Sequence, residues 1–455
     1  MADNNKIIRD MTVGSPLKQL LIFSYPLVLA NLLQQAYNMA DMLIVGRYVG
    51  SAGLTAISSA GELSMFFFFT LSGFASAGQI ILAQHVGANR RDKINSSIGT
   101  LLSLLVILGL IMTVLALIYC DGMLHLLNIP DEAFQYAHEY AMVCFLGLIP
   151  VCGYNAVGSI LRGMGDSRHP LIFIAVASIL NIVLDLAFIK YLGMGPFGAA
   201  LATVISQAVS FIVSIIFMYR NKESLHFDFK LKSFIPVKAD LKGIFSMGFP
   251  LALQMATIVI SMLYVNACVN GYGVVAAAAT AVGNKLSIVS SIIVNALAVA
   301  GASIVGQNFA AGKHDRVIRT LRDILIFSLG FCAILSAIFW FFPEQLFGLF
   351  DPNPDVIAWA KPYAPIAALY FLGSATRGTA MGLINGVGNS KLAFVCGFID
   401  GIVARVGFCT LFGVALSMGL TGYWLGNAMA GQVFGIIGLF YFISGAWKKR
   451  KLLVK

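Results

Sequence analysis

The segment Ile98–Tyr119, IGTLLSLLVILGLIMTVLALIY, runs for 22 residues without a charged side chain. An α-helix rises about 1.5 Å per residue, so about 20 apolar residues cross the roughly 30 Å hydrocarbon core of a bilayer. The whole chain of 455 residues is 59% hydrophobic and only 11% charged. This composition predicts an integral membrane protein.

Eleven further apolar runs resemble this one. Because only helices and closed barrels satisfy their backbone polar groups in lipid, runs of this length predict transmembrane helices. We therefore expect an all-α integral membrane protein with twelve transmembrane helices, near residues 16–42, 54–82, 97–119, 138–161, 170–190, 196–219, 242–269, 280–306, 321–342, 362–384, 392–416 and 422–446.

Lysine and arginine fall mainly on one side of this pattern. Of the 30 Lys and Arg residues, 24 lie in the two tails and in the loops of one side. Cytoplasmic loops retain such residues, which predicts a multi-pass protein of the inner (plasma) membrane with both termini cytoplasmic. The net charge of +10 is then explained by topology and by anionic lipid headgroups, so we expect no nucleic-acid partner.

The second half of the chain repeats the first at a steady offset. Gly78, Gln84 and Ala88 recur 223 residues later as Gly301, Gln307 and Ala311, and Pro26 recurs 224 residues later as Pro250. A repeat after six spans predicts two six-helix lobes related by a pseudo-two-fold along the membrane normal, with the substrate cavity between them. The expected divisions are an amino-terminal lobe (1–219), a cytoplasmic linker (220–240) and a carboxy-terminal lobe (241–455).

Two carboxylates, Asp41 and Asp185, lie inside the apolar runs. A charged side chain at the bilayer centre costs about 2.5–3.5 kcal/mol on the scale derived from membrane insertion, and such residues usually face an ion or substrate path. This placement indicates a transporter.

Catalytic and nucleotide-binding motifs are missing from the sequence. Its six histidines show no HExxH or metal-ligand spacing, there is no GxxxxGK[ST] motif, and the seven cysteines form no CxxC pair. We therefore expect neither an enzyme nor a cofactor, apart from a coupling ion.

Several motifs in order along the chain resemble the multidrug and toxin extrusion (MATE) family. They are Asp10-Met-Thr-x-Gly14-x-Pro16, Asn31-Leu-Leu-Gln-Gln35 with Asp41, Ile44-Val-Gly46-Arg47, Ala83-Gln84, Gly163-x-Gly165-Asp166, Asn181-x-x-x-Asp185 and Gly198-Ala-Ala-x-Ala-Thr203. The resemblance covers essentially the whole chain and is greatest to the DinF-like branch. The NorM-like branch keeps acids on helices 7 and 10, where this chain has Gln254 and Arg377 and no acid.

The resemblance implies secondary active multidrug efflux, in which amphipathic, often cationic, small molecules leave as H+ or Na+ enters. It implies a cation or proton site at Asp41, Asn155, Asn181, Asp185 and Thr203. The expected partners are these small molecules and membrane lipids, with no obligatory protein partner. The alternative is a lipid-linked saccharide or lipid flippase of the same superfamily, which would hold phosphate groups in a basic cavity.

The spacing of the expected site residues agrees with this chemistry. Asn181 and Asp185 are four apart and share one helix face. If Asp41 and Thr203 converge there, the oxygens suit a transient Na+ or a proton shared between carboxylates, which do not easily both ionise at low dielectric. Alternatively, these polar groups only hold helices 1, 5 and 6 together.

Three other features have two interpretations each. Glu62 and Lys285, again 223 apart, either form an outer gate or extend separately toward lipid headgroups. Pro26 marks a helix bend, either structural or functional. Asp400 and Arg405 are five apart, about 140° around an α-helix, so we expect them not to face each other, and Arg405 either stabilises its lobe or contacts substrate.

Overall fold

The computed structural model describes residues 8–127, 129 and 131–453, and within these ranges the chain forms helices and no strand. Ten helices are long and apolar enough to cross a membrane, and the pair 132–146 and 148–163, bent by 46°, would be an eleventh span. The remaining expected span, 362–384, corresponds to α14 (Ala360–Gly386), a 27-residue helix that carries Arg377. Each expected transmembrane segment therefore has a helical counterpart.

The elements follow the repeat seen in the sequence. The first half contains α1 (Pro16–Tyr48), α2 (Ser51–Gly87), η1 (Arg91–Lys93), α3 (Ile94–Ile118), α4 (Cys120–Leu126), α5 (Asp131–Leu146), α6 (Leu148–Gly163), α7 (Arg168–Asp185), the π-helical η2 (Leu186–Tyr191) and α8 (Gly195–Arg220).

The second half begins after η3 (Leu231–Phe234). It contains α9 (Lys238–Asn270), α10 (Val274–Ala310), α11 (His314–Phe341), α12 (Pro343–Gly348), α13 (Pro354–Ile357), α14, α15 (Ser390–Phe398), the π-helical η4 (Ile399–Val406), α16 (Gly407–Thr410), the π-helical η5 (Leu411–Ala415), α17 (Gly419–Ile443) and η6 (Ala446–Lys449). Helices α1 and α9 both have 33 residues, and α2 and α10 both have 37.

The chain forms two compact units. Among the described residues, unit 1 comprises 8–10 and 25–252, and unit 2 comprises 11–24 and 253–453. Helix α1 therefore passes from unit 2 to unit 1 next to Pro26, and α9 passes from unit 1 to unit 2 next to Pro250. Proline inside a helix removes one backbone donor and weakens the helix there. In both helices, the change of unit coincides with this weak point.

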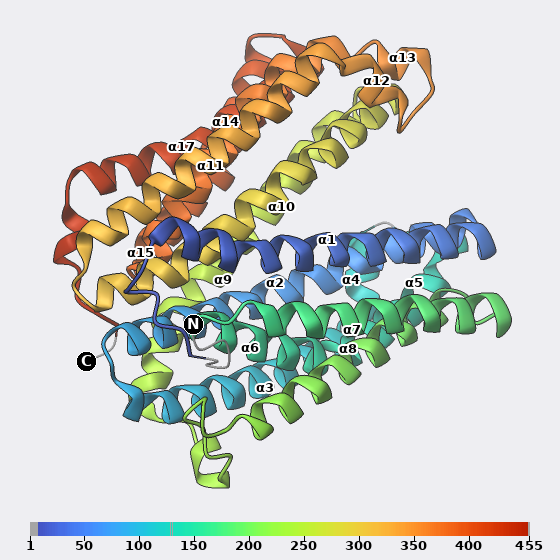
Figure 1. The fold of residues 1–455 in the computed structure, drawn as a ribbon. Coiled ribbons are helices and arrows are strands. Elements are labelled where there is room, and N and C mark those ends of the chain that lie inside the picture. The colour runs from blue at the N-terminus through green and yellow to red at the C-terminus, as the bar shows by residue number, and fades with distance from the viewer. Residues whose placement is uncertain (1–7, 128, 130, 454–455) are drawn as a thin grey trace. The chain divides into compact units, whose positions relative to one another are not determined.

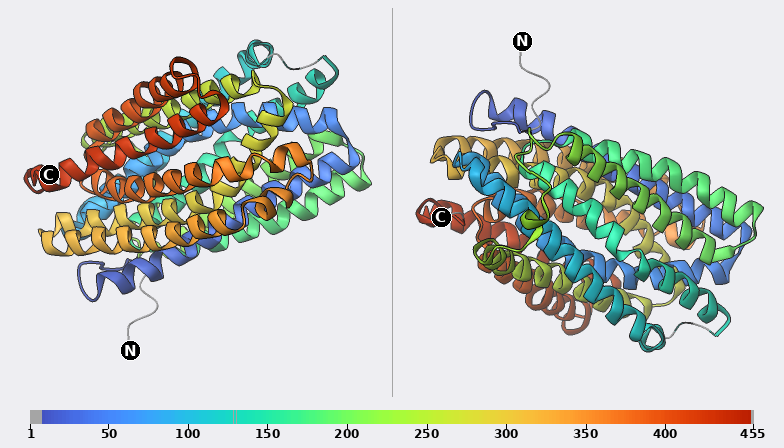
Figure 2. Two further views of the ribbon diagram at one scale, coloured as in Figure 1. Left: turned by 90° about the horizontal axis from the view of Figure 1, so that it is seen from above. Right: turned by 90° about the horizontal axis from the view of Figure 1, so that it is seen from below.

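Each unit is a helical bundle with its own core. In unit 1, α2 packs against α5 and α6, and α7 packs against α8; the green helices α7 and α8 lie side by side in the views of Figures 1 and 2. In unit 2, α14 packs against α10, α11 and α17 (Figure 1). Trp424 is buried in the second core and donates from its indole nitrogen to the Thr280 hydroxyl over 2.9 Å.

Apolar side chains also cover the outside of these bundles. On α3, for example, Ile107, Leu110, Ile111 and Val114 are each about half exposed. A soluble surface seldom carries such large contiguous apolar patches, whereas hydrocarbon solvates them without cost. The exposed apolar surface therefore agrees with a protein that spans a membrane.

The opening segment of the chain is bound to unit 2. Arg316, at the start of α11, donates to the carbonyl oxygens of Met11 and Gly14, and the Lys313 ammonium donates to Thr12. The backbone nitrogen of Met11 in turn donates to the Gln307 side chain over 2.8 Å. These charge-assisted contacts fix the residues that precede α1.

The linker is bound to α3 in unit 1. The Thr100 hydroxyl accepts from the backbone of Val237, and Ser103 donates to the Phe234 carbonyl. Within the linker, the hydrogen bond from the Ser233 hydroxyl to Asp228, aided by the backbone N–H of Lys230, lowers the pKa of the Asp228 carboxyl. The connection between the two halves is thus a folded segment.

We predict that Gly99→Ala loosens this linker. A methyl group at Gly99 would lie 1.7 Å from the Ser233 carbonyl oxygen, so the linker backbone must move away from α3. Limited trypsin digestion should then cut at Lys230 and Lys232 several times faster than in the unaltered protein. Gly109→Ala on the same helix is the control, because its methyl group meets Ile149 at an ordinary 3.8 Å. Equal cleavage of both variants would contradict the close packing at Gly99.

Candidate functional site

A pair of carboxyl groups lies inside unit 1. Asp41 projects from α1, and Asp185 is the last residue of α7, where the helix widens into η2. The two carboxyl groups are in hydrogen-bond contact with each other, and Asp185 is completely buried. Among the described side chains, no donor reaches either oxygen of Asp185 or Oδ1 of Asp41. Two carboxyl groups can hydrogen-bond to each other only when one carries a proton, so this arrangement has the chemistry to share a proton or to hold a cation.

Neutral oxygens from two helices complete the group. Asn181 lies one turn before Asp185 on α7, and its amide nitrogen donates to the Thr203 hydroxyl of α8 over 3.3 Å. This bond turns the amide so that its oxygen, Oδ1, is buried without a donor in the described structure. The structure therefore brings together four of the five residues expected from the sequence.

The sequence analysis did not assign Tyr37, Gln34 and Gln207 to this site. The Tyr37 hydroxyl is in hydrogen-bond contact with both glutamine side chains and lies within electrostatic range of Asp41. Residues 34, 37 and 41 are spaced i, i+3 and i+7, which places them on one face of α1, and Gln207 lies one turn after Thr203 on α8. The polar stripe on each helix was the signal that could have identified them.

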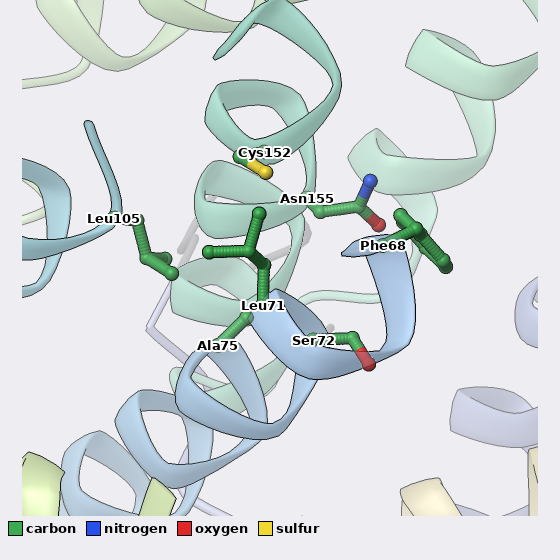
Figure 3. A pocket seen from close by; sticks show the side chains of 7 residues that line it. All are labelled: Phe68, Leu71, Ser72, Ala75, Leu105, Cys152 and Asn155. Carbon is green, nitrogen blue, oxygen red and sulfur yellow. The ribbon is translucent and has the colours of Figure 1, made fainter. Parts of the chain in front are cut away.

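Asn155 occupies a different environment. Its amide nitrogen donates to the Val151 carbonyl of its own helix, α6, over 2.8 Å. Figure 3 shows Asn155 beside a small pocket formed with Phe68, Leu71, Ser72 and Ala75 of α2, Leu105 of α3 and Cys152. This pocket has room for about one water molecule.

Comparison with known proteins decides the family. The sequence profile of the MatE family matches residues 26–187 and 250–411, one match in each half. The chain belongs to the MatE family. A relative, "Probable multidrug resistance protein YpnP" of Bacillus subtilis, is 28% identical over 98% of this chain and 99% of its own length. "Probable multidrug resistance protein NorM" of Thermotoga maritima is 27% identical over 96% of this chain and 94% of its own length.

Solved structures share the fold of this MatE protein. One, described as "Crystal structure of MATE in the bent conformation", is 25% identical and superimposes with a TM-score of 0.88 over 98% of this chain and 99% of its own. A transporter from Pyrococcus furiosus, 22% identical, reaches 0.91 over 99% of this chain and all of its own. The all-helical transporter fold expected from the sequence is confirmed.

The two charges expected at an outer gate lie in different units of the MatE protein. Glu62 and Lys285 each follow the first residue of a 37-residue helix by eleven positions, on α2 and α10, and both are exposed. Their pairing stays a prediction.

Pro26, the expected helix bend, is buried within α1, which is continuous from Pro16 to Tyr48.

Our expectation for Asp400 and Arg405 was wrong. Nη2 of Arg405 lies 3.4 Å from Oδ1 of Asp400, so the two side chains do face each other. Residues 399–406 form the π-helical η4, in which the hydrogen-bond spacing is five residues rather than four. This wider turn brings positions i and i+5 to the same side of the helix.

The structure also gathers three groups that could hold a metal ion. The ligand atoms of Cys120, Asp121 and His138 lie within 4.8 Å of one another, although the histidine is 17 residues away from Asp121. Burial, with the nearby Asp121 carboxylate, raises the pKa of the Cys120 thiol to about 11. A protonated thiol is a poor ligand, so a metal ion would first have to displace this proton.

We predict that Asn181 and Asn155 differ in their effect on ion binding. Asn181→Ala removes a free oxygen beside the carboxyl pair, so Na+ binding by calorimetry, or proton release followed with a pH dye, should weaken about tenfold, the loss of one charge-assisted contact. Asn155→Ala should leave both measurements unchanged, because that amide bonds to its own helix. A larger loss in Asn155→Ala than in Asn181→Ala would contradict the arrangement described here.

Proposed function

We propose that this MatE protein is a secondary active multidrug exporter, which exchanges amphipathic and cationic small molecules for H+ or Na+ at the pair Asp41 and Asp185. One observation carries the proposal: two carboxyl groups share a buried position without a donor, among oxygens that remain free. Two relatives named as probable multidrug resistance proteins, each matching almost the full length of this chain, support it.

The site chemistry explains how ion and substrate would be coupled. The unbonded atoms at the site are carboxylate and amide oxygens, the ligands that small hard cations prefer. A proton or Na+ neutralises the pair, whereas the empty pair is negative and attracts a cationic substrate. Linkage requires that ion and substrate weaken each other's binding by the same factor when they compete for this charge.

The branch and the orientation belong to the same proposal. We assign the protein to the DinF-like branch, because the acids that the resemblance implies lie in unit 1, whereas α9 and α14 carry Gln254 and Arg377 at the positions considered for the NorM-like branch. Both termini face the cytoplasm according to the distribution of Lys and Arg. Amphipathic cations and membrane lipids are the proposed partners, and the transporter works without an obligatory protein partner.

We predict that Asp41→Asn and Asp185→Asn each abolish efflux while the protein stays folded. The amide keeps the shape of the carboxyl group and removes its charge. Dye export from proteoliposomes under an imposed proton gradient, and separately under a sodium gradient, measures the loss and identifies the coupling ion.

The control for this experiment is Asp355→Asn, an equivalent change at an exposed side chain near the start of α13. It should export dye at the rate of the unaltered protein. Full export by Asp41→Asn at normal protein level, under either gradient, would exclude the proposed role of the pair.

We also propose that Glu62 and Lys285 pair when the outer mouth closes. The prediction is that Glu62→Lys slows export through like-charge repulsion, and that adding Lys285→Glu restores part of the rate. A double-mutant cycle on export rates measures this coupling. Purely additive effects of the two changes would instead support two independent side chains at the headgroups.

A further inference from the structure

A buried cluster of charges in unit 2 has an excess of positive charge. Asp400 of η4 is completely buried, and its two oxygens face two guanidinium groups: Oδ1 lies 3.4 Å from Arg405, and Oδ2 lies 3.1 Å from Arg377 of α14. The electrostatic neighbours of Arg405 include no carboxylate other than Asp400. Two permanent cations thus share one carboxylate inside the bundle.

Close helix packing removes this cluster from solvent. Helix α9 runs alongside α15 and η4, with Gln254 against Gly397 and Thr257 against Gly401, where any added side chain would collide. The Arg405 side chain is only 3% exposed and also donates to the Ser261 hydroxyl of α9 over 3.4 Å. A net charge in such a position carries a desolvation cost, unless a further partner compensates it.

Several polar atoms around the cluster have no partner in the described structure. They include Nε of Arg405 and both polar atoms of the Gln254 side chain, which is completely buried on α9. Oδ2 of Asp400 faces Arg377 as an ion pair without an aligned hydrogen bond. These unpartnered atoms are two donors and two acceptors, but two guanidinium groups face a single carboxylate, so a group that carries negative charge would complete the cluster.

Arg377 is the accessible member of the cluster. Its side chain is 21% exposed, and its guanidinium lies over the ring of Phe434, itself completely buried, at 5.6 Å. The planar fork of arginine matches carboxylate and phosphate groups with two parallel hydrogen bonds. Only Nη1 of this fork faces Asp400, so other donors can bind a ligand.

We infer that Arg377, with Arg405 behind it, binds the carboxylate or phosphate group of an amphipathic ligand. Unit 2 thus accepts anionic or zwitterionic molecules, in addition to the cations assigned to the carboxyl pair of unit 1. The inference widens the range of substrates of the proposed transporter and does not depend on the carboxyl pair.

Two dyes with the same xanthene ring system test this inference: fluorescein, which is anionic, and rhodamine 6G, which is cationic. Fluorescence anisotropy of each dye is titrated with the purified full chain in an uncharged detergent. Arg377→Gln should weaken fluorescein binding about tenfold or more, as expected when a charged hydrogen-bonding partner is lost. Rhodamine 6G binding should persist and thereby report that the variant is folded.

Three further variants ensure that the conclusion does not rest on Arg377→Gln alone. Arg377→Lys keeps the charge but loses the fork, and should bind fluorescein with intermediate affinity. Asp400→Asn raises the net charge of the cluster and should bind fluorescein more tightly than the unaltered protein. Arg322→Gln on α11 is the matched control, because Arg322 also pairs with an aspartate but is 65% exposed, and both dyes should stay within about twofold.

Mixed micelles distinguish the source of the anionic group. Displacement of fluorescein by phosphatidylglycerol, but not by phosphatidylcholine, assigns the arginines to a lipid headgroup; resistance to both lipids assigns them to a soluble substrate. Fluorescein binding that is equal in the unaltered protein, Arg377→Gln and Asp400→Asn overturns the inference. Asp41→Asn should retain fluorescein affinity, so failure of the efflux proposal and failure of this one are separable.

Discussion

The structure depends on one constraint: in a hydrocarbon surrounding, each buried charge needs a partner of opposite charge or a proton. Unit 1 meets it with two carboxyl groups, Asp41 and Asp185, that contact each other. Unit 2 meets it with two guanidinium groups that share Asp400. When the carboxyl groups are ionised, the two clusters therefore carry opposite excess charge.

The internal repeat also explains how the chain connects its two bundles. The residues before α1 are bound by Arg316 in unit 2, and the linker before α9 is bound by α3 in unit 1. Each of these two long helices thus starts in one unit and continues in the other, and the change of unit lies close to its proline. Since proline interrupts the backbone hydrogen bonds of a helix, both connections are weakened close to the point where they change unit.

Local spacing predicted part of the candidate site and failed where the helix was not regular. Asn181 and Asp185 share a face of α7, as the four-residue spacing indicated, and Asn181 contacts Thr203 as expected. Asn155 bonds to its own helix instead, because an asparagine can satisfy its amide at the carbonyl four residues earlier. Asp400 and Arg405 meet through a π-helical turn, which no residue pattern had indicated.

The sequence by itself determined the helical membrane fold, the repeat and the presence of acids inside the spans. It could do so because bilayer thickness and backbone hydrogen bonding leave few alternatives for long apolar runs. Only the tertiary structure decided which polar groups meet: the carboxyl pair joins residues 144 positions apart, and Arg377 reaches Asp400 from another helix. Such contacts depend on how helices pack and rotate against one another, and small shifts in side-chain packing across many residues fix that rotation.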